Sequence, residues 1–122
     1  MTIIHIVIGK LKSWVTQEQS DHFILGLKSL KTLPCVKDGR VLVGGPSLTE
    51  PIEQSRGLQH AFVSYHENMD ALNDYQVAKV QFFKNLPYDD PLDYETVIRF
   101  DFEVAKEDEH LCEFGVLSNL KA

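Results

Sequence analysis

The segment formed by residues 2–11 places the tightest limit on the fold. It is short, rich in β-branched residues and apolar at Ile3, Ile4, Ile6, Val7 and Ile8. A nearly continuous apolar run of this length is typical of a strand that is buried on both faces. Such a strand needs a layer of structure on each side of its sheet, and the rest of the chain offers few candidates for those layers.

Two helices and three further strands are predicted from the spacing of the apolar residues. N-cap side chains mark the helix starts at Thr16, with Gln19 as its capping-box partner, and at Asn68. Pro34 ends the first helix, and the second runs to about Asn85. The segments with strand character are separated by a loop at 46–56 and are these: Val36–Val43, Leu58–Tyr65 and Glu95–Val104.

The element order β-α-β-β-α-β predicts an α+β fold of the ferredoxin-like, split βαβ class. Right-handed crossovers place the first and third strands in the middle of an antiparallel sheet. Two helices cover one face of that sheet only, so we expect the sheet of a second copy to cover the other face, giving a homodimeric α+β barrel. This domain spans residues 1–104, and we expect the apolar tail, 105–122, to pack on the dimer.

Composition removes several classes of function. The 122 residues suit one domain, and a net charge of −6 with 12 scattered Lys and Arg argues against nucleic acid and anionic membranes as partners. No apolar run reaches the roughly 20 residues of a membrane span. Cys35 and Cys112 are expected to be free thiols, so we expect a cytoplasmic protein. No ligand spacing indicates a metal or another cofactor.

Two histidines are the sharpest chemical signal, because His5 and His60 each interrupt an apolar strand and the predicted sheet makes those strands neighbours. Imidazoles beside a cavity would suit enolisation or aldol chemistry, although each ring can equally be a hydrogen-bonded core residue. Tyr75 could polarise a carbonyl group or simply fill the edge of the core. Three further histidines stand among polar residues and are expected to be solvated: His22, His66 and His110.

Four short segments in a fixed order carry a resemblance to a known family: Ile4–Val7, Gln59–Val63, Asp74–Tyr75 and Val97–Phe102. The chain resembles the stress-responsive A/B barrel (Dabb) family of dimeric α+β barrels from about residue 3 to 104. Within that family it is similar to olivetolic acid cyclase-like polyketide cyclases, which work without a metal or organic cofactor.

The resemblance implies a cavity between the sheet and the second helix, lined by His5, His60 and Tyr75. Val7 and Phe62 would contact the substrate there. In the family's cyclases a histidine does the main proton work, and Gln81 stands at the matching position. An amide cannot accept that proton near neutral pH. We therefore expect His60 as the general base, Tyr75 polarising the carbonyl group and His5 relaying a proton, with Gln81 as a hydrogen-bond partner of the substrate.

Two functions remain open at this point. The histidine pair favours a cyclase, a lyase or a related tailoring enzyme that acts on a small hydrophobic, carbonyl-rich or polyketide-like molecule. Gln81 favours a non-catalytic dimeric protein that binds a ligand or responds to stress.

Overall fold

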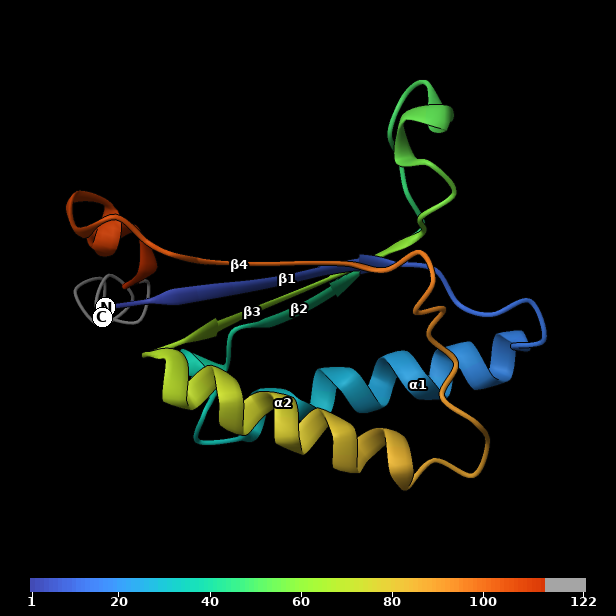
Figure 1. Ribbon diagram of the computed structural model, residues 1–122, viewed down its shortest axis with the longest axis horizontal. Helices are drawn as coiled ribbons and strands as arrows, with labels where there is room; N and C mark the ends of the chain where they lie inside the picture. Colours follow the sequence, from blue (N-terminus) through green and yellow to red (C-terminus); the bar gives the residue numbers. More distant parts are fainter. Residues whose placement is uncertain (114–122) are drawn as a thin grey trace, which may run out of the picture.

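The computed structural model describes residues 1–113 and contains one antiparallel sheet of four strands (Figure 1). Its strand order is β2-β3-β1-β4, which confirms the ferredoxin-like α+β class with β1 and β3 in the middle. The main elements are β1 (Ile3–Gly9), α1 (Gln17–Ser29), β2 (Val41–Gly44), β3 (His60–His66), α2 (Met69–Lys84) and β4 (Ile98–Glu103).

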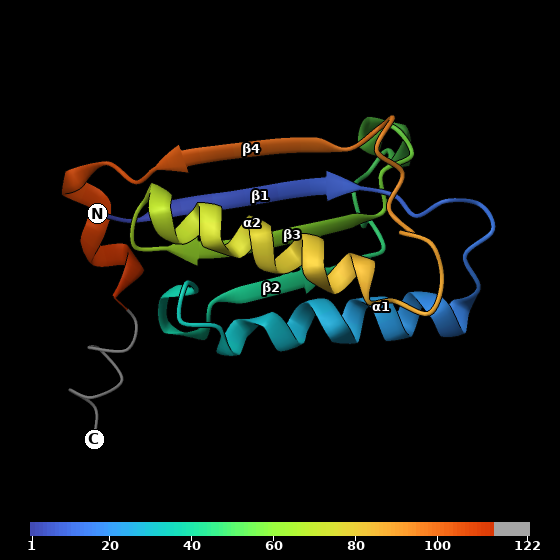
Figure 2. The same cartoon turned by 60° about the horizontal axis from the view of Figure 1, so that its bottom comes forward.

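Both helices lie on one face of the sheet, with α1 beside β2 and α2 across the two central strands (Figure 2). They begin where their caps were predicted. The Thr16 side chain accepts a hydrogen bond from the Gln19 amide and Gln19 reciprocates, while Asn68 accepts from the amide of Ala71. Capping of this kind satisfies N–H groups that have no partner within the helix.

The core lies between the helices and the inner face of the sheet. Its helical members, Phe23 and Leu27 from α1 and Leu72 and Tyr75 from α2, are buried. Gly26 lets the helices approach closely, since a Cβ there would lie 2.4 Å from Cζ of Phe82.

Strand β4 presents its apolar residues on the side of the sheet away from the helices. Ile98, Phe100 and Phe102 alternate along the strand and are 52%, 61% and 39% exposed. Arg99 and Asp101 lie on the helix side, opposite Val7 and His5 of β1. The inner face of the sheet therefore receives charged groups from its edge.

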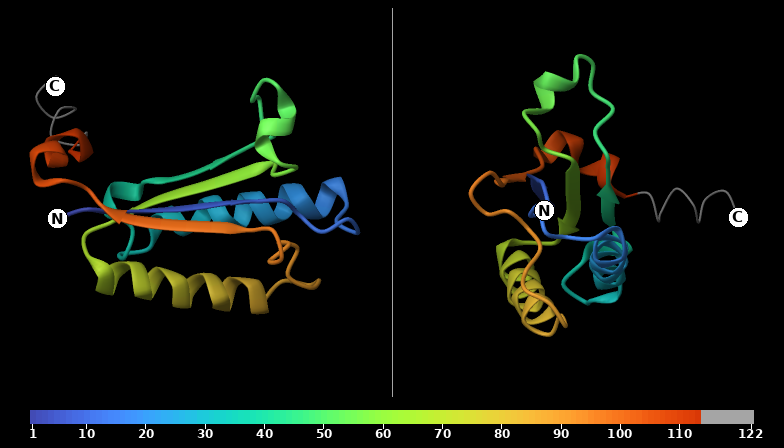
Figure 3. Two further views of the ribbon diagram at one scale, coloured as in Figure 1. Left: turned by 45° about the horizontal axis from the view of Figure 1, so that its top comes forward. Right: turned by 90° about the vertical axis from the view of Figure 1, so that its right-hand side faces the viewer.

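Strand β2 departs furthest from its predicted boundaries, and the predicted loop after it contains a helical turn. Strand β2 begins at Val41 and not at Val36, because residues 37–39 form a short 3-10 turn in which Asp38 and Gly39 have positive φ (52° and 68°). The loop at 46–56 contains another 3-10 turn, Ile52–Ser55, and rises from the side of the sheet opposite the helices (Figures 1 and 3).

The start of the tail lies against the N-terminal end of β1. Residues Lys106–Cys112 form a 3-10 segment, the hydroxyl of Thr2 donates to Glu109, and the Arg40 guanidinium donates to the carbonyl of Cys112. Positions 114–122 lie outside the described residues, so docking of the whole tail on a dimer stays a prediction. Within residues 1–113, no helix is both long and apolar enough to span a membrane.

Candidate functional site

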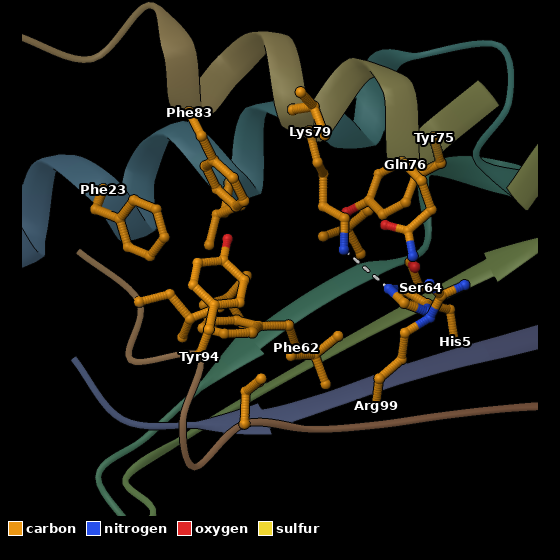
Figure 4. A pocket seen from close by; sticks show the side chains of 17 residues that line it. His5, Phe23, Phe62, Ser64, Tyr75, Gln76, Lys79, Phe83, Tyr94 and Arg99 are labelled. Atoms are coloured by element: carbon orange, nitrogen blue, oxygen red, sulfur yellow. Dashed lines mark hydrogen bonds between the residues drawn. The ribbon is translucent and has the colours of Figure 1, made fainter. Parts of the chain in front are cut away.

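A cavity of about 360 Å³ lies between the inner face of the sheet and the two helices (Figure 4). This volume falls in the range of small-molecule sites. Most of its wall is apolar, with the rings of Phe23, Phe62 and Phe83 toward one end. Polar side chains gather at the other end: His5, Ser64, Tyr75, Lys79 and Arg99. Such a site suits a molecule with an apolar body and one polar group.

Three side chains from three elements form a hydrogen-bonded row at the polar end. The row begins with Asp101 of β4, whose Oδ1 lies 2.5 Å from Nδ1 of His5 on β1. On the other side of the ring, Nε2 of His5 lies 2.9 Å from Nζ of Lys79 on α2. The strand register explains the first contact, because His5 and Asp101 are directly opposite in the β1–β4 pair.

The partners of the His5 ring fix its tautomer. A carboxylate only accepts, so Nδ1–H donates to Asp101, and Nε2 is left to accept from the Lys79 ammonium. Burial and the Lys79 charge lower the pKa of His5 to about 4, against the opposing pull of Asp101. His5 is 1% exposed and neutral at pH 7.

The two charged ends of the row are also perturbed. Burial, followed by the charge of Arg99, lowers the pKa of Lys79 to about 8. Burial pushes the pKa of Asp101 upward, but hydrogen bonds from His5 and Arg99 outweigh it and the net direction is down. Arg99 donates from Nε to Oδ2 of Asp101 at 2.9 Å, and its Nη2 forms an ion pair with the same oxygen at 2.8 Å. Asp101 is therefore a fixed anion that orients His5.

Tyr75 lies beside the row, with its ring centroid 6.1 Å from that of His5 and 5.1 Å from Nζ of Lys79. Burial raises the pKa of Tyr75 to about 12, although its hydrogen bond with Ser64 acts in the opposite direction. The phenol therefore stays protonated at neutral pH and can donate a hydrogen bond to a substrate oxygen.

His66 corrects one expectation, because it is fully buried and not solvated. Its Nε2 lies 2.8 Å from Oγ of Ser64 and its Nδ1 lies 2.7 Å from the carbonyl oxygen of Cys35. The ring also packs on Tyr75, with a centroid distance of 4.8 Å. Through these contacts His66 helps to fix the positions of Ser64 and Tyr75.

His60 and the His5–Tyr75 pair do not share a cavity, which corrects the predicted grouping. His60 lies at the far end of β3, opposite Gly9, and lines a second hollow beside the loop at 46–56. Its pKa is lowered by burial, and its Nδ1 is buried without a hydrogen-bond partner among the described residues. His5 lies opposite Ser64, four residues along the extended strand from His60, so the two imidazoles are held apart.

Gln81 does not lie in the main cavity, where it was predicted to contact the substrate. Its side chain is exposed instead. The physical reason is helical phase. Residues six apart on an α-helix point to different sides, whereas residues four apart share a face. Lys79, four residues after Tyr75, therefore occupies the place expected for Gln81. Val7 and Phe62 line the cavity, and their contact with a substrate stays a prediction.

Lys79 and Asp101 are the residues that sequence reasoning missed. A lysine on an otherwise mixed helix is usually a solvated residue, and its spacing from Tyr75 was the available signal. Asp101 could have been found from strand parity, since it alternates with the apolar residues of β4 and must lie on the opposite face. Among residues 1–113, no group of three or more His, Cys, Asp or Glu side chains is arranged to hold a metal ion.

Comparison with known proteins gives a family and a fold. The family model described as "Stress responsive A/B Barrel Domain" matches residues 3–104. No curated protein matches the chain.

Three solved structures show the same fold. A hydroxynitrile lyase from Passiflora edulis aligns with a TM-score of 0.63 at 18% identity, covering 86% of this chain and 94% of the lyase. A Dabb family protein from Mesorhizobium loti gives 0.63 at 15% identity, covering 85% and 97%. A dimeric ferredoxin-like protein of unknown function from Thermobifida fusca gives 0.61 at 20% identity, covering 85% and 92%.

Proposed function

The chain belongs to the stress-responsive A/B barrel domain family, and on that premise we propose that it is a cofactor-independent enzyme acting on a small carbonyl compound. The reaction is a proton transfer next to the carbonyl group, of the kind that starts an aldol cyclisation of a polyketide-like substrate. One observation carries this proposal: the Asp101–His5–Lys79 row stands at the polar end of an otherwise apolar cavity.

In the proposed reaction, Nε2 of His5 takes the proton from the carbon beside the carbonyl group. Asp101 stabilises the imidazolium that forms, because its Oδ1 already holds Nδ1–H at 2.5 Å. The phenol of Tyr75 donates to the carbonyl oxygen, where negative charge develops. Phe23, Phe62 and the other apolar residues hold the body of the substrate and exclude water.

The protonation states of His5 and Lys79 in the free protein show what a substrate must change before His5 can act as a base. A ring with a pKa of about 4 and with Nε2 bonded to Lys79 is a weak, occupied base in the free protein. Catalysis therefore requires that a bound substrate draws the Lys79 ammonium away from Nε2. If no ligand draws Lys79 away, His5 cannot act as a base, and the protein binds its ligand without catalysis.

A solvent-exchange experiment tests the proposal. We expect the protein to catalyse the exchange of the α-protons of an aromatic ketone that carries a carboxylate, 3-benzoylpropionate, for deuterium in D₂O, followed by ¹H NMR. General base catalysis typically contributes about 10²–10⁴-fold, so His5→Gln should lower the exchange rate by that order. Gln81→Ala is the matched control and should keep the wild-type rate, since Gln81 is exposed.

Two results would count against this proposal. An unchanged rate in His5→Gln would remove His5 as the base. A ketone of this kind that binds in the cavity and yet shows no exchange would favour the non-catalytic, ligand-binding function.

We further propose that the protein is a homodimer whose sheets face each other. Three strands present apolar residues on the side away from the helices, and the most exposed are Leu42, Ile98 and Phe100, at 68%, 52% and 61%. Exposed apolar residues gathered on one face of a sheet are typical of an interface. Two structural neighbours are described by name as dimeric ferredoxin-like proteins, which supports the same arrangement.

A further inference from the structure

We propose that the molecule bound in the main cavity carries a carboxylate, that Lys79 binds this carboxylate, and that the contact frees Nε2 of His5. The inference rests on the proposed small-molecule function and names the chemical class of the ligand. It begins from the charges at the polar end of the cavity.

These charges do not balance among the described residues. Lys79 and Arg99 are cations that line the cavity, and Asp101 is the single carboxylate near them. Both oxygens of Asp101 are already bonded, Oδ1 to His5 and Oδ2 to Arg99. No carboxylate of residues 1–113 lies within 4.0 Å of Nζ of Lys79. The lysine therefore holds a partly buried positive charge against a neutral ring.

An ammonium group withdrawn from water without an anionic partner is unfavourable. The protein relieves part of this cost by lowering the pKa of Lys79 to about 8, chiefly through burial. A ligand carboxylate would relieve it more completely, because the ion pair would form in a site of low dielectric with two cations nearby. The apolar wall beyond Lys79 then fits the hydrocarbon part of an organic acid.

The same contact changes His5. In the free protein, Nζ of Lys79 lies 2.9 Å from Nε2 and the lysine charge is a major cause of the low pKa of His5. A carboxylate that pairs with Lys79 offsets this charge and draws the ammonium toward itself. The groups that face Lys79 are His5 on β1, Asp101 and Arg99 on β4, Tyr75 on α2 and His66 on β3. The ligand therefore uncovers the base that acts on it.

Matched probes test the inference by calorimetry. 4-Phenylbutyrate and 4-phenylbutyramide have the same ring and chain and differ in the charge of the head group. Charge-assisted hydrogen bonds exceed neutral ones enough that wild-type protein should prefer the acid by about 10-fold or more. Lys79→Met should remove that preference and keep the affinity for the amide, which also shows that the variant is folded. Lys84→Met, an exposed lysine on the same helix, should behave as wild type.

The uptake of protons on binding is a second measurement. A lysine with a purely structural role would not contribute to it. Pairing with a carboxylate raises the pKa of Lys79, so at pH 8.5 the wild type should take up a fraction of a proton when it binds the acid. Buffers of different ionisation enthalpy measure this uptake, which should vanish in Lys79→Met. In ¹⁵N NMR spectra, the acid but not the amide should shift Nε2 of His5.

The outcomes separate the two proposals. If the amide binds as tightly as the acid in the wild type, the anionic ligand class is wrong and the small-molecule site survives. If the acid is preferred equally by Lys79→Met, another residue holds the carboxylate and the inference is overturned. If neither probe binds at millimolar concentration, the proposed cavity function fails together with the inference.

Discussion

The titration of Lys79 is the most direct physical consequence of the site. Its pKa is lowered from 10.5 to about 8. At pH 7, about 10% of the molecules should therefore carry a neutral Lys79, against roughly 0.03% for a lysine in water, which is a difference of about 300-fold. We expect this lysine to deprotonate at a pH where solvated lysines remain charged.

Carbon NMR of protein labelled at lysine Cε can follow this step between pH 6 and 11. The Lys79 resonance is identified by its absence in Lys79→Met. Its midpoint should fall near pH 8, while lysines that lie in water should titrate near 10.4. A midpoint near 10.4 for Lys79 would refute the description of a charge confined in the cavity.

Two neighbouring charges provide tests of sign. Arg99 lowers the pKa of Lys79, so Arg99→Gln should move the midpoint upward. Asp101 raises that pKa, so Asp101→Asn should move it downward. If both variants shifted the midpoint in the same direction, a change of structure and not electrostatics would explain the result.

Four further predictions concern stability and assembly. The folded-state pKa of His5 is lowered to about 4 from 6.5, so the stability that its neutral form contributes is complete above pH 6.5 and is lost as the pH falls toward 4. Urea unfolding should show this loss, and His5→Gln should reduce it; an equally steep loss in the variant would assign it elsewhere. Gly26→Leu should destabilise the protein by about 1–3 kcal/mol in the same assay, because even a Cβ would lie 2.4 Å from Phe82, and an unchanged midpoint would mean that α1 and α2 can separate freely. Light scattering at micromolar concentration should give about twice the chain mass of 13.9 kDa, with Phe100→Lys returning it toward the monomer value; a monomeric wild type would exclude the sheet-to-sheet dimer. Deleting residues 105–122 should lower the melting temperature, and an unchanged value would argue against a docked tail.

The fold was largely predictable because its signals are local. The caps at Thr16 and Asn68 and the apolar run of β1 determine where elements begin, and chain topology then leaves few arrangements for six elements. Strand β2 was overextended because Val36 is apolar and buried like a strand residue, although the 3-10 turn Lys37–Gly39 separates it from the strand.

The site was only partly predictable because it depends on register and helical phase. His5 and Tyr75 were identified, but His60 was grouped with them although it lies at the other end of β3. His60 has the same parity on β3 as Ser64, which lies opposite His5, but it is four residues further along the strand. Lys79 and Asp101 were missed because residue type alone suggests solvated charges, whereas the β1–β4 register and the four-residue spacing from Tyr75 bring them to His5.

The division of the site between sheet and helix has a consequence for how its chemistry could be altered. The histidine and its carboxylate come from paired strands, where a change of register would displace a whole edge of the sheet. The facing groups come from α2, at Gln76, Lys79 and Phe83, and a substitution there leaves the sheet untouched. Introducing Gln76→His would therefore place a second imidazole in the cavity, whereas Gln81→His would place it in solvent. Substitutions on α2 could therefore select different head groups by engineering while the β1–β4 pair stays unchanged.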